Sequence, residues 1–576
     1  MKMLKKLLQA YSINKAMLFL IFMGSILWSL TMVKSGLVYS YGMGFWGPNG
    51  HDGIWHIALS ESLAKSSWQM PVFSGESIKN YHIGFDLILA FLHKITFIPV
   101  VNLYFQILPP IFAVLIGFFC YLFVYEWKKS KVQAFWSTFF VYFGGSLGFI
   151  VTYIRDKQIG GESIFWAQQG ISTLINPPFA LSLLTMFLGL LILQKGVSFK
   201  DKRLLILTTF IFGILIQIKV YAGILVICGL FAAGMQELVR HRKVSLIKVA
   251  IGALILSILL FSPMSGEIGQ NIVFKPFWFL EGMMSTPDRL NWPKFAEAMA
   301  NYKLGGVLLK LIASYSLAFL IFIVGNFGTR LISLFWFIRN GFKIINYQYI
   351  DVLVVVIIVA GIIASTFFIQ SGTPWNTIQF MYYSLVFSGI LAGIWLGQYL
   401  EKMEKSKLNT TLLHSAVVLV VLFTIPTTVG SLWFNYLPER PPAKISREEL
   451  EALYFLRDQH EGVILTQPFD RSKALAAIDD PPRPLYLYES GAYVSAFSKK
   501  PVYLEDEVNL EITGYEWRSR RRSSEEFFSG KLSDEAFLKS NSIVYIYLIK
   551  NGMDFSINKN ITKLFENSEV LIYKFN

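Results

Sequence analysis

This sequence has few of the residues that cross-link or solvate a secreted globular domain. Only two of its 576 residues are cysteines, and charged residues make up 16% of the chain. Cys120 and Cys228 both lie in long apolar runs, where a thiol behaves as a small apolar side chain. A disulfide framework for the polar parts of the chain is therefore excluded. Hydrophobic residues make up 54%, which indicates a polytopic membrane protein.

Apolar runs long enough to cross a bilayer occur throughout the first three quarters of the chain. Such a run needs about 20 residues, and it must be helical because backbone groups in lipid have to bond within their own segment. The sequence therefore predicts an all-α polytopic membrane bundle of about eleven transmembrane helices. The predicted spans are 14–33, 100–125, 132–154, 174–194, 203–219, 221–238, 246–262, 304–326, 351–369, 377–399 and 411–434.

Lysine and arginine gather in alternate loops between these spans. The basic segments are 1–15, 128–131, 195–203, 240–248, 330–343 and 402–407. Because loops rich in lysine and arginine stay in the cytoplasm, we expect a cytoplasmic N-terminus and a C-terminus outside the plasma membrane. We also expect the first span to be retained as an anchor. This topology accounts for the net charge of +14 without a nucleic-acid partner.

The chain changes character after residue 436, where the apolar runs end and charged residues become frequent. We predict a transmembrane domain over 1–436 and an extracytoplasmic α/β domain over 437–576. In the second domain, helices are expected at 446–459 and 533–540, and Ser446 with Glu449 is expected to cap the first of them. Strands are expected at 462–467, 484–489, 501–504, 542–549 and 570–575.

Titratable residues are concentrated in the first external loop, residues 34–99. Four of the seven histidines lie between His51 and His93, and Asp52 and Asp86 lie in the same stretch. Apolar positions after His51 predict a helix, which would place Asp52 and His56 on one face. A carboxylate beside an imidazole can serve as a general base.

Two other interpretations of this group stay open. Asp52 and His56 could bind a divalent cation, with His51 or His82 as another ligand. Alternatively, Asp52 caps the helix and the Asp–His pair is an ordinary surface contact. The residue types alone do not choose between these roles, and no other cofactor is required.

The layout of the chain resembles the GT-C class of integral-membrane glycosyltransferases. It is most similar to bacterial and archaeal members related to the polyprenyl-phosphate-sugar-dependent protein mannosyltransferases. One span is followed by a long loop that opens with an Asp and, four residues later, a His; the element YHIGFDLILA follows at 81–90, before many spans and an external α/β domain. The shared motifs are short and lie mainly in 51–90 and 370–383.

The resemblance implies a reaction as well as a fold. It implies that Asp52 is the catalytic carboxylate, as general base or as the group that orients the acceptor. It also implies transfer of a sugar from a polyprenyl-phosphate carrier, held among membrane lipids, to a glycan, lipid or protein acceptor at the outer surface. The Trp-Trp-Asp signature of oligosaccharyltransferases is absent from the sequence, which argues against transfer of a preassembled glycan to Asn.

Further residues are candidates for binding these substrates. An ionisable residue at membrane depth is functional by default, although a lysine can also extend to the interface. Arginine offers a phosphate two parallel hydrogen bonds, whereas lysine offers a point charge. The candidates are His82, Asp86, Glu162, Lys219, Lys275, Arg289, Trp375, Asn376 and Gln379.

Three charged segments of the second domain fit none of these roles. The runs 458–460 and 504–508 have no partner at a spacing that would build a site, and we predict that both are surface turns. The basic run 518–522 could hold an anionic acceptor or lipid headgroups. Such runs are more often a solvated face, and we assign this one no catalytic role.

Two other classes of protein compete with a transferase. A transporter or flippase for polyprenyl lipids or polysaccharides would use charged residues inside the spans and internal repeats. The predicted spans hold almost no such charges, and the sequence has no convincing repeat. A non-catalytic membrane scaffold with an external binding domain would tolerate the loss of His51, Asp52 and His56 together.

Overall fold

The structure, a computed structural model, consists of two compact units that are described separately. It describes residues 11, 13–265, 272–341, 347–370, 374–406, 410–532, 534–550 and 561–575. The first unit contains the described residues up to Leu30, Pro110–Pro263 and the described residues from 272 to Asn435. The second is built mainly from Thr31–Pro109 and Tyr436–Asn576. Loop 34–99 thus belongs to the same compact unit as the C-terminal segment.

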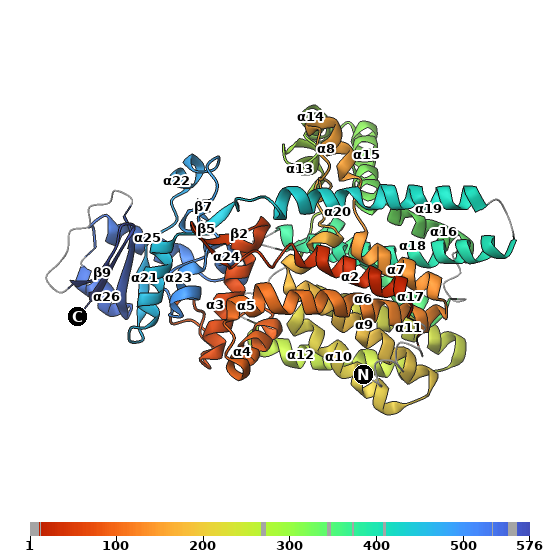
Figure 1. The fold of residues 1–576 in the computed structure, drawn as a ribbon, viewed down its shortest axis with the longest axis horizontal. Coiled ribbons are helices and arrows are strands. Elements are labelled where there is room, and N and C mark those ends of the chain that lie inside the picture. Colours follow the sequence, from red (N-terminus) through yellow and green to blue (C-terminus); the bar gives the residue numbers. More distant parts are fainter. Residues whose placement is uncertain are drawn as a thin grey trace. The chain divides into compact units, whose positions relative to one another are not determined.

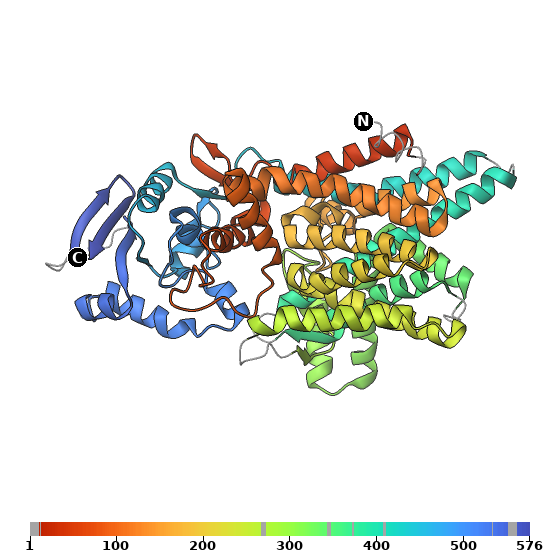
Figure 2. The ribbon, with the colours of Figure 1, turned by 90° about the horizontal axis from the view of Figure 1, so that it is seen from below.

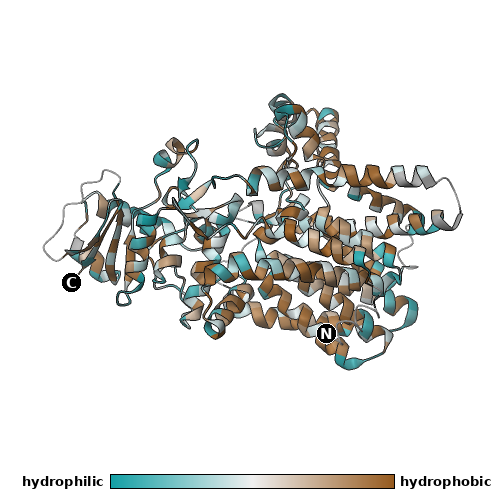
Figure 3. Ribbon diagram, viewed as in Figure 1, coloured by the Kyte–Doolittle hydropathy of each residue, from teal (hydrophilic) through white to brown (hydrophobic). Residues whose placement is uncertain are grey.

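The first unit is a helical bundle whose long helices run alongside one another (Figures 1 and 2). Apolar residues dominate these helices (Figure 3), as expected for segments that lie in lipid. The helices are α2 (Lys15–Ser29), α6 (Leu108–Lys128), α7 (Lys131–Phe143), α8 (Gly148–Asp156), α9 (Pro177–Ser198), α10 (Lys202–Ile218), α11 (Val220–His241), α12 (Ser245–Phe261), α13 (Leu280–Ser285), α14 (Pro293–Leu304), α15 (Leu308–Phe327), α16 (Ser333–Asn340), α17 (Tyr349–Phe367), α18 (Gln379–Ser406), α19 (Thr410–Thr424) and α20 (Pro426–Ser431).

Each of the eleven predicted spans coincides with a helical segment. Among the described residues, eight segments are long and apolar enough to cross a membrane, so the chain is a multi-pass membrane protein. The other three segments are α2, α10 and α12, with 15, 17 and 17 residues. Because a span needs about 17–25 residues, the number eleven stays a prediction. The eight are Val100–Lys128, Lys131–Asp156, Pro177–Ser198, Val220–His241, Leu308–Asn340, Tyr349–Phe367, Asn376–Met403 and Ser415–Tyr436.

One predicted span ends too early. The expected segment 304–326, followed by a basic cytoplasmic turn at 330–343, is a single apolar stretch, Leu308–Asn340, in which a 3₁₀ turn at Gly328–Ile332 joins α15 to α16. Arg330 therefore lies inside this stretch, where it is 2% exposed. The positive charge of Arg330 predicts a cytoplasmic turn because the local sequence does not show that the partners of this arginine lie on other segments.

A glycine stripe on α18 allows α7 to approach closely. Gly389, Gly393 and Gly397 repeat every four residues and so share one helix face. A Cβ atom on Gly393 would lie 2.2 Å from the backbone nitrogen of Ser137, and one on Gly397 would lie 2.6 Å from Cα of Gln133. Small residues at this spacing let membrane helices gain dispersion energy by backbone contact, since lipid gives them no hydrophobic driving force.

The second unit combines two four-stranded sheets with short helices. One sheet has the order β6 (Val463–Thr466), β8 (Ile543–Ile549), β10 (Val570–Phe575) and β9 (Ile561–Glu566), with β6 and β8 parallel. The other has the order β1 (Val38–Tyr39), β2 (Gly42–Phe45), β5 (Ala443–Ile445) and β7 (Arg483–Pro484). Helices α3 (Asp52–Ala64) and α4 (Gly84–Thr96) come from loop 34–99. The remaining helices are α5 (Val100–Asn102), α21 (Arg447–Arg457), α22 (Arg471–Ala476), α23 (Tyr493–Ser498), α24 (Glu507–Thr513), α25 (Trp517–Phe528) and α26 (Asp534–Ser540).

The expected α/β elements of this unit are largely present. Strands β6, β8 and β10 and helices α21 and α26 occupy their predicted positions. Ser446 Oγ accepts the amide of Glu449 at 3.0 Å and the Glu449 carboxylate accepts the amide of Ser446 at 3.1 Å, which confirms the predicted cap. The strand predicted at 484–489 is wrong, because Leu485–Leu487 form a 3₁₀ turn. The strand predicted at 501–504 is reduced to a bridge between Val502 and Ile464.

The glycine stripe leads to a prediction about stability. Gly393→Ala is expected to destabilise the chain by about 1–3 kcal/mol, because the new methyl group would overlap the backbone of α7 rather than a mobile side chain. The thermal unfolding midpoint of the purified chain in detergent measures the effect. Gly160→Ala is the matched control, since its Cβ would meet nothing closer than 3.8 Å. Equal midpoints for the two variants would contradict the described contact between α7 and α18.

Candidate functional site

Helix α3 presents one carboxylate to solvent. The helix begins at Asp52, as predicted, and every residue from Gly53 to Glu61 is buried whereas Asp52 is exposed. The capping interpretation of Asp52 is wrong, because His51 occupies the cap position. A carboxylate in the first turn is favoured by the positive end of the helix dipole. The fold therefore holds Asp52 at the exposed end of an otherwise buried helix.

His56 pairs with Asp86 rather than with Asp52. Its Nδ1 lies 2.8 Å from Oδ1 of Asp86, and the side chains are 5% and 0% exposed. Ser60 Oγ donates to the same oxygen at 3.4 Å, while Asp86 Oδ2 is buried without a partner. Burial raises the pKa of Asp86, and His56 opposes that rise. Asp86 thus orients the imidazole of His56 by a hydrogen bond. Both side chains are buried, so neither is accessible to solvent or to a substrate.

Aromatic rings surround this pair and link it to Asp52. The ring of His56 stacks on Tyr104 at 5.9 Å and meets Phe85 edge to face at 5.8 Å. The hydroxyl of Tyr81 lies 3.5 Å from His56 Nε2. Burial raises the pKa of Tyr81, and the negative charges of Asp86 and Asp52 raise it further. Asp52 therefore acts electrostatically on the residues around His56.

The other two histidines of the group lie at the edge of this cluster. The ring of His82 packs against Tyr81 at 4.6 Å. His51 Nδ1 is hydrogen-bonded to Ser490 Oγ, and burial lowers the pKa of His51 while Asp52 opposes that change. Within the described part of the chain, no three His, Cys, Asp or Glu side chains gather as a metal set. The cation hypothesis for His51, Asp52 and His56 thus finds no geometric support.

A second polar cluster lies inside the first unit. Glu162 is 6% exposed and accepts the amide of Gln169 at 2.8 Å and the hydroxyl of Ser172 at 2.6 Å. Burial raises the pKa of Glu162 to about 7. The side chain of Gln169 also accepts from Arg330 and donates to Asn326. Arg330 and Gln169 were not predicted, because neither residue lies in a recognisable motif.

Lys219 is buried near this cluster. It separates α10 from α11, is 5% exposed, and donates to Asn176 Oδ1 at 3.3 Å. Asn176, Gln169, Ser172 and Arg330 line one small cavity. Lys219 is therefore buried rather than extended to the surface, and its role as a functional residue stays a prediction.

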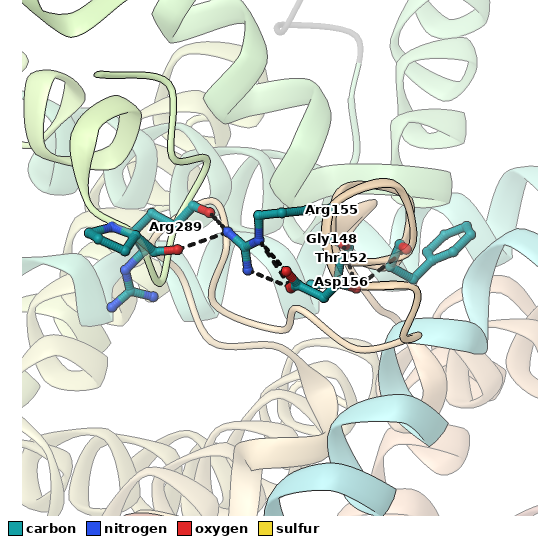
Figure 4. A network of polar contacts seen from close by, with 7 residues as sticks. Gly148, Thr152, Arg155, Asp156 and Arg289 are labelled. Atoms are coloured by element: carbon teal, nitrogen blue, oxygen red, sulfur yellow. Dashed lines mark hydrogen bonds and ion pairs between the residues drawn. The ribbon is translucent and has the colours of Figure 1, made fainter. Parts of the chain in front are cut away.

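Arg289 connects two loops of the first unit. Its guanidinium donates to the carbonyl of Ser163 and stacks on Trp166 at 5.1 Å. Its own carbonyl accepts from Arg155 at 2.5 Å, and Arg155 also binds Asp156 (Figure 4). These contacts fix the loop, so a phosphate role for Arg289 stays a prediction.

Lys275 lies beside an open apolar groove. The lysine is exposed, and its amide donates to the carbonyl of Phe367 at 2.8 Å, next to the pairing of β3 (Ile272–Phe274) with β4 (Phe368–Gln370). The groove is lined by Lys275, Lys303, Glu281 and apolar side chains of α15. Lys303 is paired with Glu281 at 3.1 Å.

The turn before α18 brings two of its predicted polar residues together. Gln379 Nε2 lies 3.5 Å from Asn376 Oδ1, and Gln379 Oε1 is buried without a partner. The side chain of Trp375 lies outside the described part of the structure. A role for this turn in sugar binding stays a prediction.

The run 504–508, predicted as a surface turn, is instead buried. Glu505, Asp506 and Glu507 are 8%, 3% and 5% exposed. Burial raises the pKa of Glu505 to about 8 and that of Asp506 to about 7. The basic run 518–522 is also not simply solvated, because Arg521 binds Glu507 at 2.6 Å and Arg520 stacks on Phe73 at 3.7 Å. Charge alone is a poor signal here, because Glu505 and Glu507 have partners 10 to 14 residues away and Asp506 caps α24.

The fold, rather than the sequence, connects this chain to known proteins. No family model and no curated protein matches the sequence. The oligosaccharyltransferase AglB from Archaeoglobus fulgidus, solved with an inhibitory peptide and a dolichol-phosphate, has a TM-score of 0.51 at 12% identity, over 93% of this chain and 69% of that one. The arabinofuranosyltransferase AftD from Mycobacteria has a TM-score of 0.51 at 12% identity, over 97% of this chain and 40% of that one.

Both of these proteins are GT-C integral-membrane glycosyltransferases. The expected likeness to the GT-C class is therefore confirmed at the level of fold. At 12% identity the comparison concerns architecture and transfers no individual residue.

The buried acids of the second unit lead to a prediction about pH. The pKa of Glu505 is about 8 in the folded chain, against 4.5 for an unperturbed Glu. Between these values the folded state holds a proton that the unfolded state has released, so stability falls as pH rises, by at most about 1.4 kcal/mol per pH unit. Glu505→Gln cannot titrate. Its stability relative to wild type is therefore expected to increase from about pH 5 to about pH 8.

Thermal unfolding of the purified chain over this pH range measures the difference. Glu439 is exposed, and Glu439→Gln is the control that should show no such trend. A constant offset between Glu505→Gln and wild type at every pH would contradict the shifted pKa.

Proposed function

We propose that this protein is a membrane glycosyltransferase that moves a sugar from a polyprenyl-phosphate carrier to an acceptor at the outer face of the membrane. The observation that carries the proposal is an exposed carboxylate, Asp52, at the end of a buried helix in a chain of which 93% and 97% align with two GT-C structures. The AglB structure with dolichol-phosphate supports a lipid phosphate as the carrier.

Asp52 is the group that would act on the acceptor. In the proposed step, an acceptor hydroxyl oxygen forms a bond to the anomeric carbon of the donor sugar. The bond from that carbon to the phosphate oxygen breaks, and the phosphate leaves with the bonding electron pair. Asp52 receives the proton of the hydroxyl or, at the least, orients that hydroxyl for attack.

His56 and Asp86 support this group without touching the substrates. Both side chains are almost fully buried, and His56 Nδ1 is engaged by Asp86. We therefore assign both as positioning residues that fix the rotation of α3 about its axis. Because residues four apart share a helix face, that rotation sets the direction of Asp52.

The lipid carrier needs an apolar surface for its chain and a positively charged side chain for its phosphate. The groove along α15 offers apolar side chains with Lys275 at its edge, and Lys219 is a buried lysine that donates to Asn176. Either arrangement suits a lipid chain ending in a phosphate, because lysine provides a point charge for a phosphate oxygen. His82, Glu162, Arg289, Trp375, Asn376 and Gln379 remain proposed substrate-binding residues.

The role of Asp52 can be tested in cells without knowing the sugar. Asp52→Asn keeps the shape of the side chain but removes its charge, so sugar transfer is expected to fall by about 100-fold or more. Mass spectrometry of surface glycans in a deletion strain, complemented with wild type or variant, measures the product. Asp479→Asn is the control, since Asp479 is also exposed and lies elsewhere in the second unit.

Two outcomes would count against the proposal in different ways. Full complementation by Asp52→Asn would show that Asp52 is not the key group. A deletion strain with unchanged glycans, glycolipids and glycoproteins would remove the transferase activity itself.

A further inference from the structure

The C-terminal part of the second unit contains a cavity at one edge of its parallel strands. Strand β8 runs parallel to β6, and the segment around Val502 runs parallel to β6 on its other side. Two backbone hydrogen bonds make this second pairing. The amide of Ile464 donates to the carbonyl of Pro501 at 2.9 Å, and the amide of Tyr503 donates to the carbonyl of Ile464 at 2.8 Å. The carboxyl ends of all three segments line the cavity. In α/β folds, ligands bind at this edge of the strands.

The cavity is partly open to solvent, so a small molecule can reach its wall from outside. Aromatic rings of Tyr486, Tyr488 and Tyr493 form part of its wall. Such rings provide a flat apolar surface together with a hydroxyl group, which suits the mixed polar and apolar faces of a sugar ring.

The wall offers an anion little positive charge. Its lining contains five acids, Asp470, Glu489, Glu505, Asp506 and Glu507, but only one lysine, Lys473, which lies 3.9 Å from Asp470. Because burial raises the pKa of Glu505 to about 8 and that of Asp506 to about 7, these two serve as hydrogen-bonding groups more than as charges. Both oxygens of Glu505 accept backbone amides, from Val494 at 2.7 Å and Ser495 at 3.0 Å. Asp506 caps α24 and Glu507 is held by Arg521. The carboxylates are therefore fixed in place and can accept hydrogen bonds from hydroxyl groups.

One polar group in the wall lacks a partner. Ser524 is 1% exposed, lines the cavity from α25, and its Oγ forms no hydrogen bond within the described structure. A buried hydroxyl without a partner costs free energy unless a ligand or water satisfies it. This observation is independent of the acidic residues and also indicates a polar ligand.

We infer that this cavity binds an uncharged sugar residue of the acceptor glycan. That the sugar belongs to the acceptor rests on the proposed function, whereas the binding of a sugar in the cavity does not. His51, the neighbour of Asp52, links that carboxylate to the cavity: its Nδ1 is hydrogen-bonded to Ser490 Oγ, and its ring packs against Tyr488 of the cavity wall at 4.6 Å. A glycan anchored by one residue in the cavity would have its next residues near the carboxylate that acts on it.

Sugar binding to the full chain in detergent tests the inference directly. The probes are methyl glycosides of neutral hexoses and pentoses, with glucuronic acid as the anionic probe, observed by saturation-transfer NMR and titration calorimetry. Wild type is expected to bind at least one neutral glycoside about tenfold more tightly than glucuronic acid. Ser524→Leu fills the cavity and is expected to weaken that binding about tenfold or more.

Two further variants keep the test decisive. Glu489 is exposed at the cavity edge, and Glu489→Gln is expected to weaken sugar binding several-fold without loss of folding, even if Ser524→Leu misfolds. Glu439→Gln is the matched control, an exposed glutamate outside the cavity wall that should bind as wild type does.

The outcomes separate this inference from the proposed function. Absence of binding by every neutral glycoside, equal binding of glucuronic acid, or unchanged binding in both folded cavity variants would overturn the sugar site. If glycan transfer in cells continues in those cases, the transferase proposal still stands. Sugar binding that persists in Asp52→Asn, together with lost transfer, supports both.

Discussion

The hydrogen bond between His56 and Asp86 is the contact on which the candidate site depends. It ties α3 to α4, which are joined by a long irregular segment with no other buried ion pair in its described residues. Because both groups are buried among aromatic rings, breaking the bond would leave an unpaired charge or dipole in a medium of low dielectric. The pair therefore fixes α3 firmly, and with it the direction in which its first residue projects. A flexible carboxylate on a loop would not be held in one geometry in this way.

A similar principle operates within the first unit, where polar groups are clustered instead of dispersed. Arg330 bonds to Gln169 and to the carbonyls of Asn326 and Phe327. Each of these groups would be costly alone in an apolar bundle, yet together they satisfy one another. Ionisable groups buried in an apolar bundle are usually functional rather than structural, since an apolar residue in the same place would stabilise the bundle at least equally.

The sequence predicted elements better than contacts. Long apolar runs located every span segment, and the capping residues located α21, because these signals are local. The helix that begins at Asp52 was likewise readable from the apolar positions that follow His51. The partner of His56 was not, because spacing of four suggested Asp52 whereas Asp86 lies 30 residues away. The burial of Glu505 and Asp506 was missed for the same reason, since the residues that cover them come from distant segments.

The sheet formed by β1, β2, β5 and β7 has a consequence for biosynthesis. Met43 pairs with Ile445, and near this sheet the side chain of Lys34 binds the carbonyl of Leu437, 403 residues later in the chain. At about 5–20 residues per second, a ribosome needs roughly 20 to 80 seconds to make the intervening chain. During that interval the β1–β2 hairpin must wait with an unpaired edge, and such edges invite pairing with foreign strands. Correct maturation therefore requires that the edge of β2 stay unpaired until residues 443–445 have been made.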